Sequence, residues 1–397
     1  MRKATTCWLS DICSDTFIRP LTGDRTTEVA VIGGGIMGVA TTYWLSRMGI
    51  RVELLEARGL GEGATGRNAG LVLHGVSPLE DPRLLTSVLS EEGIACGYST
   101  PGHLSLASSE GIWQKIQSEA RNRPTSASPL AALAPGSCED LLNTRLSGSF
   151  FGGRWYPGGA VVHSAKLVYG LAKAAASRTA TVSCETPVLD VQTSGAGVWV
   201  RTARGVVKAD AVVHAAASGV AHLLPEFKSV LTPVRAQMMA TKPIRPLFEI
   251  GLGVDWGDVY GRQLADGRFV LGGLGAKKTT FPSEDAERTD PVIQNKLRRF
   301  LSFAFPGFPK FEVSQRWAGL MDCTADGKPV IGRHPGRPNQ WLIAGFNGHG
   351  MPAALGAGRA LAESVATGTV LTCLAAYDPG RFHPLLREDT KERGSHA

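Results

Sequence analysis

The strongest constraint on the fold of this chain is the stretch from Val29 to Glu56, which has the pattern of a strand, a glycine turn, a helix and a second strand. Four apolar residues open it, as in a parallel strand that is buried on both faces. The spacing G-x-G-x-x-G follows, from Gly33 to Gly38. In this pattern the first glycine permits a tight turn, the second lets backbone approach a pyrophosphate, and the third lets the helix pack closely on the strand. We therefore expect a βαβ unit that binds a dinucleotide.

An acidic residue at the end of the second strand supports this interpretation. Glu56 stands 23 positions after Gly33, where a carboxylate accepts hydrogen bonds from ribose hydroxyls. The N-terminus of the helix would point at the phosphates, because its free amides and dipole favour negative charge. The alternative is an ordinary βαβ unit without a ligand. The motif does not distinguish FAD from NAD.

Composition narrows the class of protein. The 397 residues suit two domains, and 43% hydrophobic and 19% charged residues are ordinary for a globular protein. The net charge of +7 comes from scattered basic residues, so nucleic-acid binding is not indicated. Seven cysteines without a C-x-x-C pair suggest neither a disulfide framework nor a metal site. We find no signal peptide and no apolar run that could span a membrane, and we expect a soluble cytoplasmic protein.

The rest of the chain alternates between two kinds of segment. A glycine-rich loop, Gly61–Gly70, follows the βαβ unit, and we expect it to pack against a ligand rather than to form a helix. Trp8 is expected to anchor the N-terminal residues onto the body. Helices are expected over 84–97, 109–121, 164–176 (with Ser164 as N-cap), 291–304 and 352–367. Strands are expected over 103–107, 188–192, 198–202, 206–208, 211–217, 232–241, 259–263, 268–273, 311–318 and 341–345, with 124–135 and 148–159 rich in loops.

This order predicts an α/β protein with two interleaved domains. A Rossmann-like nucleotide-binding domain would consist of residues 27–78, 152–222 and 322–380. A second, α+β domain with a mostly antiparallel sheet would bind the substrate and consist of residues 79–151 and 223–321. Residues 1–26 and 381–397 would be terminal extensions. Such interleaving places a pocket between the domains.

Five segments together resemble the D-amino-acid oxidase superfamily of FAD enzymes, on the glycine oxidase and sarcosine oxidase side. They are Val31–Gly38, Leu55–Ala57, Gly63–Gly70, Thr324–Gly332 and Gly345–Met351. The resemblance extends from about Thr27 to Pro379 and selects FAD over NAD.

The resemblance implies roles for particular residues. Those implied to bind FAD are Gly33, Gly35, Ile36, Met37, Gly38, Glu56, Ala57, Arg58, Thr65, Arg67, Asn68, Ala69, Gly70, Val188, Ala216, Gly348, His349, Gly350 and Met351. Those implied to face the substrate or the reacting flavin are Tyr260, Arg262, Met321 and His349. We name no general base, because an amine that binds in its neutral form does not require one. His74, which follows the glycine-rich loop, could face the same pocket, although a lone histidine is more often structural.

The resemblance also implies the chemistry. Family members transfer a hydride from the carbon beside an amine nitrogen to flavin N5, giving an imine. With O2 as acceptor, H2O2 is released, and the partner is a small-molecule amine. The alternatives are an FAD-dependent dehydrogenase with another acceptor, a non-catalytic FAD-binding subunit of a complex, and an NAD enzyme.

The sequence departs from the family at three positions. Met321 stands where relatives carry an arginine or a tyrosine, and Pro352 stands where some carry a lysine. An apolar methionine cannot replace a cation that binds a carboxylate. Unless Arg262 or another cation supplies this clamp, the substrate is not a simple amino acid such as glycine or sarcosine. Gly319 stands where some members attach FAD through a cysteine, so we expect non-covalent FAD.

Overall fold

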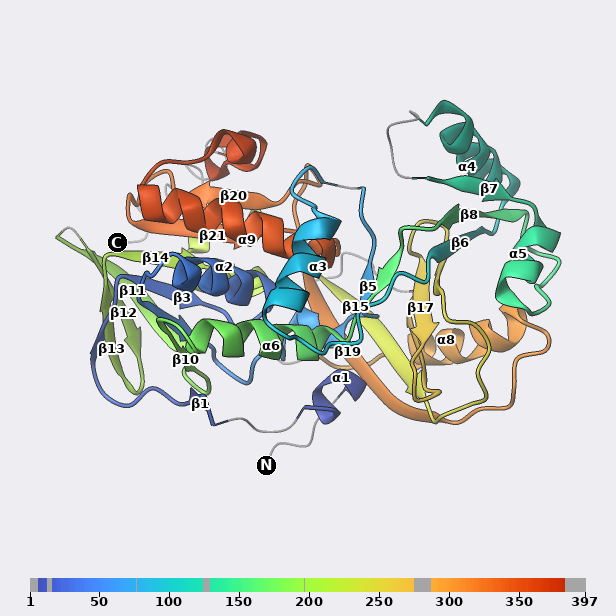
Figure 1. Cartoon of the computed structure of the whole chain (residues 1–397), viewed down its shortest axis with the longest axis horizontal. Helices are drawn as coiled ribbons and strands as arrows, with labels where there is room; N and C mark the ends of the chain where they lie inside the picture. Colours follow the sequence, from blue (N-terminus) through green and yellow to red (C-terminus); the bar gives the residue numbers. More distant parts are fainter. Residues whose placement is uncertain are drawn as a thin grey trace, which may run out of the picture.

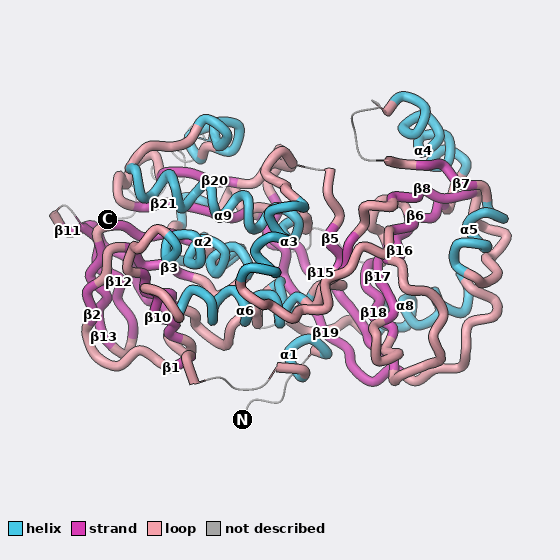
Figure 2. The backbone as a smooth tube through the Cα atoms, viewed as in Figure 1, coloured by secondary structure: helices cyan, strands magenta, loops and turns pink. Residues whose placement is uncertain are grey.

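The computed structural model describes residues 6–12, 16–75, 77–123, 129–195, 197–274 and 287–382. It has two lobes joined by several crossings of the chain (Figure 1). One lobe is built on a seven-stranded sheet and the other on an eight-stranded sheet. Figure 2 shows that the helices α2 (Ile36–Arg47), α6 (Ser164–Ala176) and α9 (Gly350–Thr367) lie together in the first lobe.

The first sheet is parallel except at one edge. Its strands have the order β1 (Ile18–Arg19), β10 (Ala180–Ser183), β4 (Val52–Leu55), β3 (Val29–Ile32), β14 (Ala211–His214), β21 (Gln340–Ala344) and β20 (Val330–Arg333). Neighbours pair in parallel apart from β20 and β21, which are antiparallel. Strands from the beginning, the middle and the end of the chain meet here, which confirms a Rossmann-like fold assembled from separate segments.

Both faces of this sheet are covered, because residues on β3 alternate between two cores. Val29 and Val31 pack toward the helices α2, α6 and α9. Ala30 and Ile32 pack toward a small sheet on the other face. That four-stranded sheet has the order β11 (Val188–Ser194), β12 (Gly197–Thr202), β13 (Gly205–Ala209) and β2 (Arg25–Thr26). The unbroken apolar sequence of β3 follows from this double burial.

The second sheet is mostly antiparallel, as expected. Its order is β19 (Val313–Cys323), β15 (Thr232–Thr241), β18 (Phe269–Gly273), β17 (Val259–Gln263), β16 (Gly251–Val254), β6 (His103–Ala107), β8 (Gly152–Tyr156) and β7 (Ala131–Leu133). Only the β16–β6 pair is parallel. One face packs on α5 (Pro135–Leu142) and α8 (Pro291–Ala304), and together they form the hydrophobic core of the second lobe. The opposite face, which carries Tyr260 and Trp317, contributes to a cluster between the lobes.

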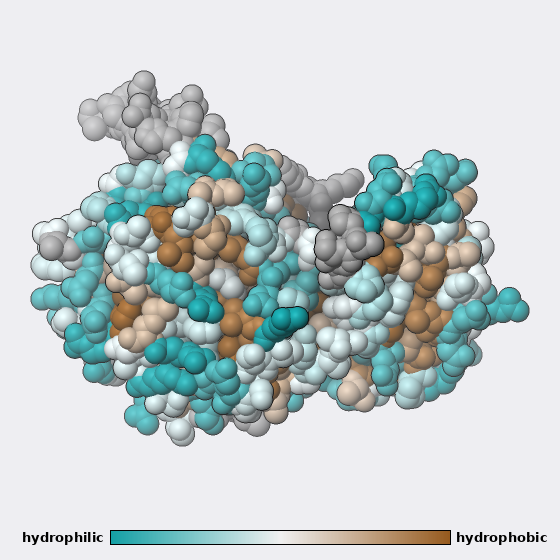
Figure 3. Space-filling view, turned by 45° about the horizontal axis from the view of Figure 1, so that its top comes forward, coloured by the Kyte–Doolittle hydropathy of each residue, from teal (hydrophilic) through white to brown (hydrophobic). Residues whose placement is uncertain are grey.

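The remaining elements close the gaps. They are α1 (Cys7–Ser10), α3 (Pro82–Glu91), α4 (Glu110–Asn122), α7 (Val220–Leu223) and the short antiparallel pair β5 (Leu71–Val72) and β9 (Ala160–Val161). Among the described residues no single helix has the length and hydropathy of a membrane span; only a sharply bent pair, α9 with Thr372–Phe382, passes on those criteria. Hydrophilic side chains cover much of the face seen in Figure 3, with apolar ones scattered over both lobes.

Several local predictions need correction. Residues 152–156, predicted as loop and assigned to the first domain, form β8 and pair with β6 in the second sheet. The prediction places helix α3 in the second domain. Its Leu85 and Val88 instead pack into the core that the first sheet forms with α2, α6 and α9. The N-cap of α6 is His163 rather than Ser164, because its Nδ1 accepts a hydrogen bond from the Lys166 amide. The loop-rich assignment of 124–135 falls partly outside the described residues, as do residues 383–397 of the predicted C-terminal extension.

Candidate functional site

The glycine turn after β3 has the geometry that a dinucleotide needs. Gly33 has φ +116°, and a Cβ there would lie 2.5 Å from the Ala215 carbonyl oxygen. A Cβ on Gly38 would lie 1.9 Å from the Gly33 carbonyl oxygen. At Gly35 the nearest atom outside the turn is Thr65 Oγ1, at 3.5 Å. Two glycines are thus fixed by close packing, whereas the middle one leaves the backbone open to a ligand, as the motif requires.

The expected ribose-binding acid lies beside this turn. Glu56 accepts hydrogen bonds from the amides of Gly34 (2.6 Å) and Arg58 (2.8 Å). Burial raises the pKa of this carboxyl, and the two amide hydrogen bonds work against that shift. The Thr186 amide donates to the Glu56 carbonyl at 2.8 Å, which brings the chain before Val188 to the same end of the sheet. Ala216 adjoins Gly33, since its amide nitrogen lies 2.9 Å from the Gly33 Cβ position.

Two arginines extend the site toward the second lobe. Arg58 and Arg67 both form ion pairs with Glu287, at 2.5 and 2.9 Å. Arg67 also donates to the carbonyl oxygens of Glu62 and Ala318, each at 2.9 Å. Ala318 lies on β19, so Arg67 ties the glycine-rich loop to the second sheet. Sequence reasoning missed Glu287, because nothing in its neighbourhood indicates a partner more than 200 positions away.

The glycine-rich loop is not irregular throughout. Ala64–Arg67 form one turn of 3₁₀ helix. Thr65 Oγ1 accepts a hydrogen bond from the Ile36 amide at 3.0 Å, so the loop contacts the N-terminus of α2. Asn68 Oδ1 accepts from the Gly70 amide (2.9 Å) and from Ser164 Oγ (2.7 Å). Residues 65–70 therefore run from the phosphate end of the site to the boundary between the lobes.

The loop before α9 lies close to the same helix N-terminus. Asn347 and Gly348 have positive φ values of 53° and 83°. A Cβ on Gly350 would lie 3.0 Å from Met37 Cε, so α2 and α9 begin side by side. Two helix N-termini that converge favour an anionic ligand between them. The side chain of His349 is exposed. Its Nδ1 lies 3.0 Å from the Asn347 carbonyl oxygen, within the same loop.

Met321, which the resemblance implies to face the substrate or the flavin, lies on β19. Its Sδ is 3.1 Å from the Cβ position of Gly348, so β19 and the loop before α9 are in contact there. The next residue, Asp322, is buried and accepts a hydrogen bond from the Gly345 amide at 2.5 Å. Burial raises the pKa of this carboxyl. Asp322 thus holds the loop that presents Gly348.

The two residues expected on β17 differ in their surroundings. Burial raises the pKa of Tyr260 to about 12, so the phenol is neutral at physiological pH. Arg262 donates from Nε to the Ala69 carbonyl oxygen (3.1 Å) and from Nη2 to the Val162 carbonyl oxygen (2.8 Å). This guanidinium therefore binds backbone between the lobes, a geometry that favours a positioning role over a carboxylate clamp.

His74 is half-buried in the loop after β5, and its two ring nitrogens are shielded from solvent without a hydrogen-bond partner among the described residues. Burial lowers its pKa, so the imidazole is neutral.

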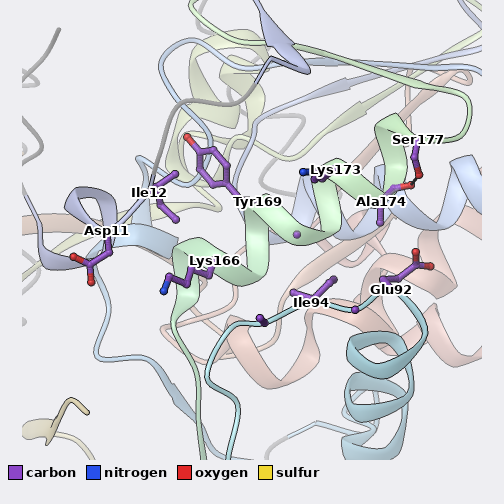
Figure 4. A pocket seen from close by; sticks show the side chains of 12 residues that line it. Asp11, Ile12, Glu92, Ile94, Lys166, Tyr169, Lys173, Ala174 and Ser177 are labelled. Atoms are coloured by element: carbon purple, nitrogen blue, oxygen red, sulfur yellow. Dashed lines mark hydrogen bonds between the residues drawn. The ribbon is translucent and has the colours of Figure 1, made fainter. Parts of the chain in front are cut away.

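A surface groove of about 550 Å³ lies elsewhere, between α1, the end of α3 and α6 (Figure 4). Asp11, Lys166 and Lys173 line it together with Glu92, and none of the predicted site residues does.

The fold and these contacts define a dinucleotide-binding protein whose site lies between a Rossmann-like domain and an antiparallel sheet. The chain matches the family model described as FAD dependent oxidoreductase (DAO) over residues 28–364. It therefore belongs to the DAO family of FAD-dependent oxidoreductases. FAD is its cofactor, and the glycine turn, Glu56 and the two helix N-termini fit that group.

Named relatives agree with this assignment. The chain is 26% identical to glycine oxidase of Geobacillus kaustophilus, over 82% of this chain and 89% of the relative. It is 25% identical to gamma-glutamylputrescine oxidoreductase of Escherichia coli, over 85% and 83%. The crystal structure of the Geobacillus kaustophilus glycine oxidase superposes with a TM-score of 0.79 at 24% identity, covering 89% of this chain and 98% of that one. The chain is an enzyme of the amine and amino-acid oxidase type.

Proposed function

We propose that this enzyme oxidises a C–N bond of an amine to an imine, and that O2 accepts the electrons and leaves as H2O2. Bound FAD supplies the two-electron acceptor for a hydride from the carbon beside nitrogen. The relatives named for glycine and for gamma-glutamylputrescine, which both carry an amine, support the substrate class. The chain's own residues would position that carbon and exclude water.

The observation that carries the substrate proposal is the contact between Met321 and Gly348. A thioether 3.1 Å from the Gly348 Cβ position makes this wall uncharged. Arg262, the cation that the sequence offers as a substitute clamp, already donates to the carbonyl oxygens of Ala69 and Val162. An α-carboxylate would therefore lose its charge-assisted hydrogen bonds here. We infer a larger or less charged amine rather than glycine or sarcosine.

The neutral Tyr260 and the half-buried, neutral His74 are the polar groups that we propose to face such a substrate. A neutral imidazole without a partner can accept a hydrogen bond from an amine.

The experiment that tests the proposed function is anaerobic reduction of the bound flavin by a panel of primary, secondary and cyclic amines, followed by mixing with air. Loss of the flavin band with at least one amine and fast reoxidation support an oxidase. Slow reoxidation would favour the dehydrogenase, and no reduction by any amine would favour a non-catalytic subunit.

We also propose that FAD binds without a covalent bond. A Cβ at Gly319 would lie 2.9 Å from both Cβ and Cδ of Arg67, so a cysteine does not fit at this position while Arg67 bridges the lobes. Acid precipitation should release the yellow colour into the supernatant. Colour that stays with the precipitated protein would contradict the proposal.

A further inference from the structure

Five consecutive carbonyl groups of the glycine-rich loop, from Gly66 to Gly70, each accept a hydrogen bond from outside the loop. The donors, in order, are Thr6 Oγ1 (2.8 Å), Trp317 Nε1 (2.9 Å), Trp8 Nε1 (2.7 Å), Arg262 Nε (3.1 Å) and the Val162 amide (2.8 Å). Four are side chains, and they come from the N-terminal segment Thr6–Ile12 and from the second sheet. Groups outside the loop thus hold its backbone at every residue from Gly66 to Gly70.

These hydrogen bonds fix the direction of the loop's amides. In a planar trans peptide the N–H points opposite to the C=O of the preceding residue. Because the Arg67 carbonyl points at Trp317, the Asn68 amide points away from it. The Asn68 carbonyl points at Trp8, so the Ala69 amide points away from Trp8. Each of these two amides therefore faces away from the tryptophan that binds the preceding carbonyl group.

Trp8 and Arg262 meet at the centre of this arrangement. The guanidinium carbon of Arg262 lies 5.4 Å from the centre of a Trp8 ring, within the range of a cation–π contact. The two side chains are 1% and 8% exposed. Around Gly70, whose φ is +68°, a Cβ would lie 2.9 Å from Arg262 Nη2 and 3.0 Å from Trp8 Cη2. The pair therefore encloses the loop so closely that only glycine fits.

Arg262 is also a buried charge in neutral surroundings. Its guanidinium donates to two backbone carbonyl oxygens and stacks on the indole of Trp8. Removing a charge from water is costly when no anion compensates it. A cation here would stabilise negative charge that develops close to residues 68–70. Arg268, just before the neighbouring strand β18, instead forms ion pairs with Asp11 and Asp266.

We propose that the N-terminal segment Thr6–Ile12 is a working part of the flavin site, in which Trp8 stacked on Arg262 positions the glycine-rich loop. The pair sets the affinity for FAD and, with the charge of Arg262, raises the reduction potential of the flavin. Trp8 lies outside the part of the chain that matches the family, which begins at residue 28. The inference rests on the FAD site of the proposed function, but not on the identity of the substrate.

The test compares Trp8→Phe, Trp317→Phe and Arg262→Lys with a matched control. Trp341→Phe is that control, because Trp341, on β21 of the first sheet, is 2% exposed and stacks at 4.9 Å with Arg333 of the edge strand β20. Three quantities are measured for each variant: the dissociation constant of FAD from the apoprotein by fluorescence, the midpoint potential of the bound flavin, and the melting temperature of the apoprotein. Thr6→Val, which removes a single donor, replaces Trp8→Phe if that variant does not fold.

We expect Trp8→Phe and Trp317→Phe to weaken FAD binding by about fivefold each, since each removes one hydrogen bond. Arg262→Lys keeps the charge but cannot bind both carbonyls and stack, so FAD binding should weaken by about tenfold. The potential should fall in all three, because each variant displaces the cation or the loop from its position beside the flavin, and Trp341→Phe should change neither quantity. Lower melting temperatures with unchanged FAD affinity and potential would overturn the proposal, as would equal effects in Trp341→Phe or wild-type behaviour of Arg262→Lys.

These outcomes are independent of the amine panel. If no amine reduces the flavin but the Trp8 and Arg262 variants still bind FAD more weakly, the positioning pair stands and the proposed function fails. If amines reduce the flavin and the variants bind FAD normally, the proposed function stands and the positioning pair fails.

Discussion

At the scale of single residues, the site depends on positions where no side chain fits. Gly70 has a positive φ, and its Cβ position is 2.3 Å from the Val162 carbonyl oxygen. Gly63, in the same loop, has no positive φ and has nothing within 4 Å of its Cβ position. The two glycines thus differ in what they do, although the sequence presents them alike.

Gly70→Ala should therefore weaken FAD binding. The new methyl group would collide with backbone and with Arg262, and the φ of +68° is unfavourable for alanine. We expect FAD affinity to fall by about tenfold or more, at a cost typical of strained backbone. The measurement is the ratio of flavin to protein after purification. Gly63→Ala is the control and should retain a full complement; equal loss in both variants would contradict the account.

Met321→Arg should restore recognition of a carboxylate. Met321 contacts the loop at Gly348, and an arginine there can bind a carboxylate through two hydrogen bonds. Reduction of the flavin by glycine or sarcosine should become at least about tenfold faster, since one charge-assisted pair contributes about 1.5–3 kcal/mol. Met321→Leu should leave both rates unchanged. An arginine variant that gains nothing would remove Met321 from the substrate site.

At the scale of elements, ion pairs that join one element to another differ in how much they contribute to the free energy of unfolding. Glu226, in a short helical turn after α7, lies 2.9 Å from both His334 and Arg337. Burial opposes ionisation, but the hydrogen bond from His334 and the charge of Arg337 lower the pKa of Glu226 to about 2. Glu312, by contrast, pairs with Lys242 on the exposed end of the second sheet.

The Glu226 cluster should make stability depend on pH in acid. A carboxyl with a lowered folded pKa contributes stability above its unfolded pKa of 4.5, and this contribution is lost as pH falls toward about 2. Glu226→Gln should cost about 2 kcal/mol in urea unfolding at pH 7 and progressively less at pH 4 and 3. Glu312→Gln should be neutral at every pH. A pH-independent cost for Glu226→Gln would show that charge is not the cause.

The sequence predicts elements well where the signal is local. The turn and helix after β3 and the helix α8 over 291–304 follow from spacing, turn residues and apolar periodicity, and the structure confirms them. The sequence did not predict β8, because the strand contains two glycines and further glycines lie close on either side, a pattern that is typical of loops. The partners of the glycine-rich loop could not be predicted, since Trp8 and Arg262 meet it from 60 and 193 positions away. A tryptophan in a polar N-terminal segment was the one available signal, and it indicated burial without indicating against what.

At the scale of the whole molecule, both lobes contact the glycine-rich loop that we propose to hold the cofactor. Trp317 and Arg262 belong to the second sheet, yet they donate to carbonyls of the glycine-rich loop. Glu287 pairs with Arg58 and Arg67 from the side of the second lobe. A ligand that orders the loop should thus stabilise the two lobes together.

Heating should accordingly unfold both lobes in one transition that FAD shifts upward. Free FAD at 100 times its dissociation constant stabilises the native state by about 2.7 kcal/mol. For a protein of this size we expect a rise of about 4 °C in the calorimetric melting temperature. Two separate transitions, of which FAD raises only one, would contradict the shared site.

The claim that the substrate is an amine without a simple amino-acid carboxylate is tested most directly by anaerobic stopped-flow reduction of the bound flavin with matched pairs. Each pair differs only in the carboxylate, as sarcosine differs from dimethylamine and proline from pyrrolidine. With Met321 beside Gly348 and Arg262 bound to backbone, we predict that the partner without the carboxylate reduces the flavin at least as fast in every pair. Reduction about tenfold faster by the carboxylated partners would contradict it.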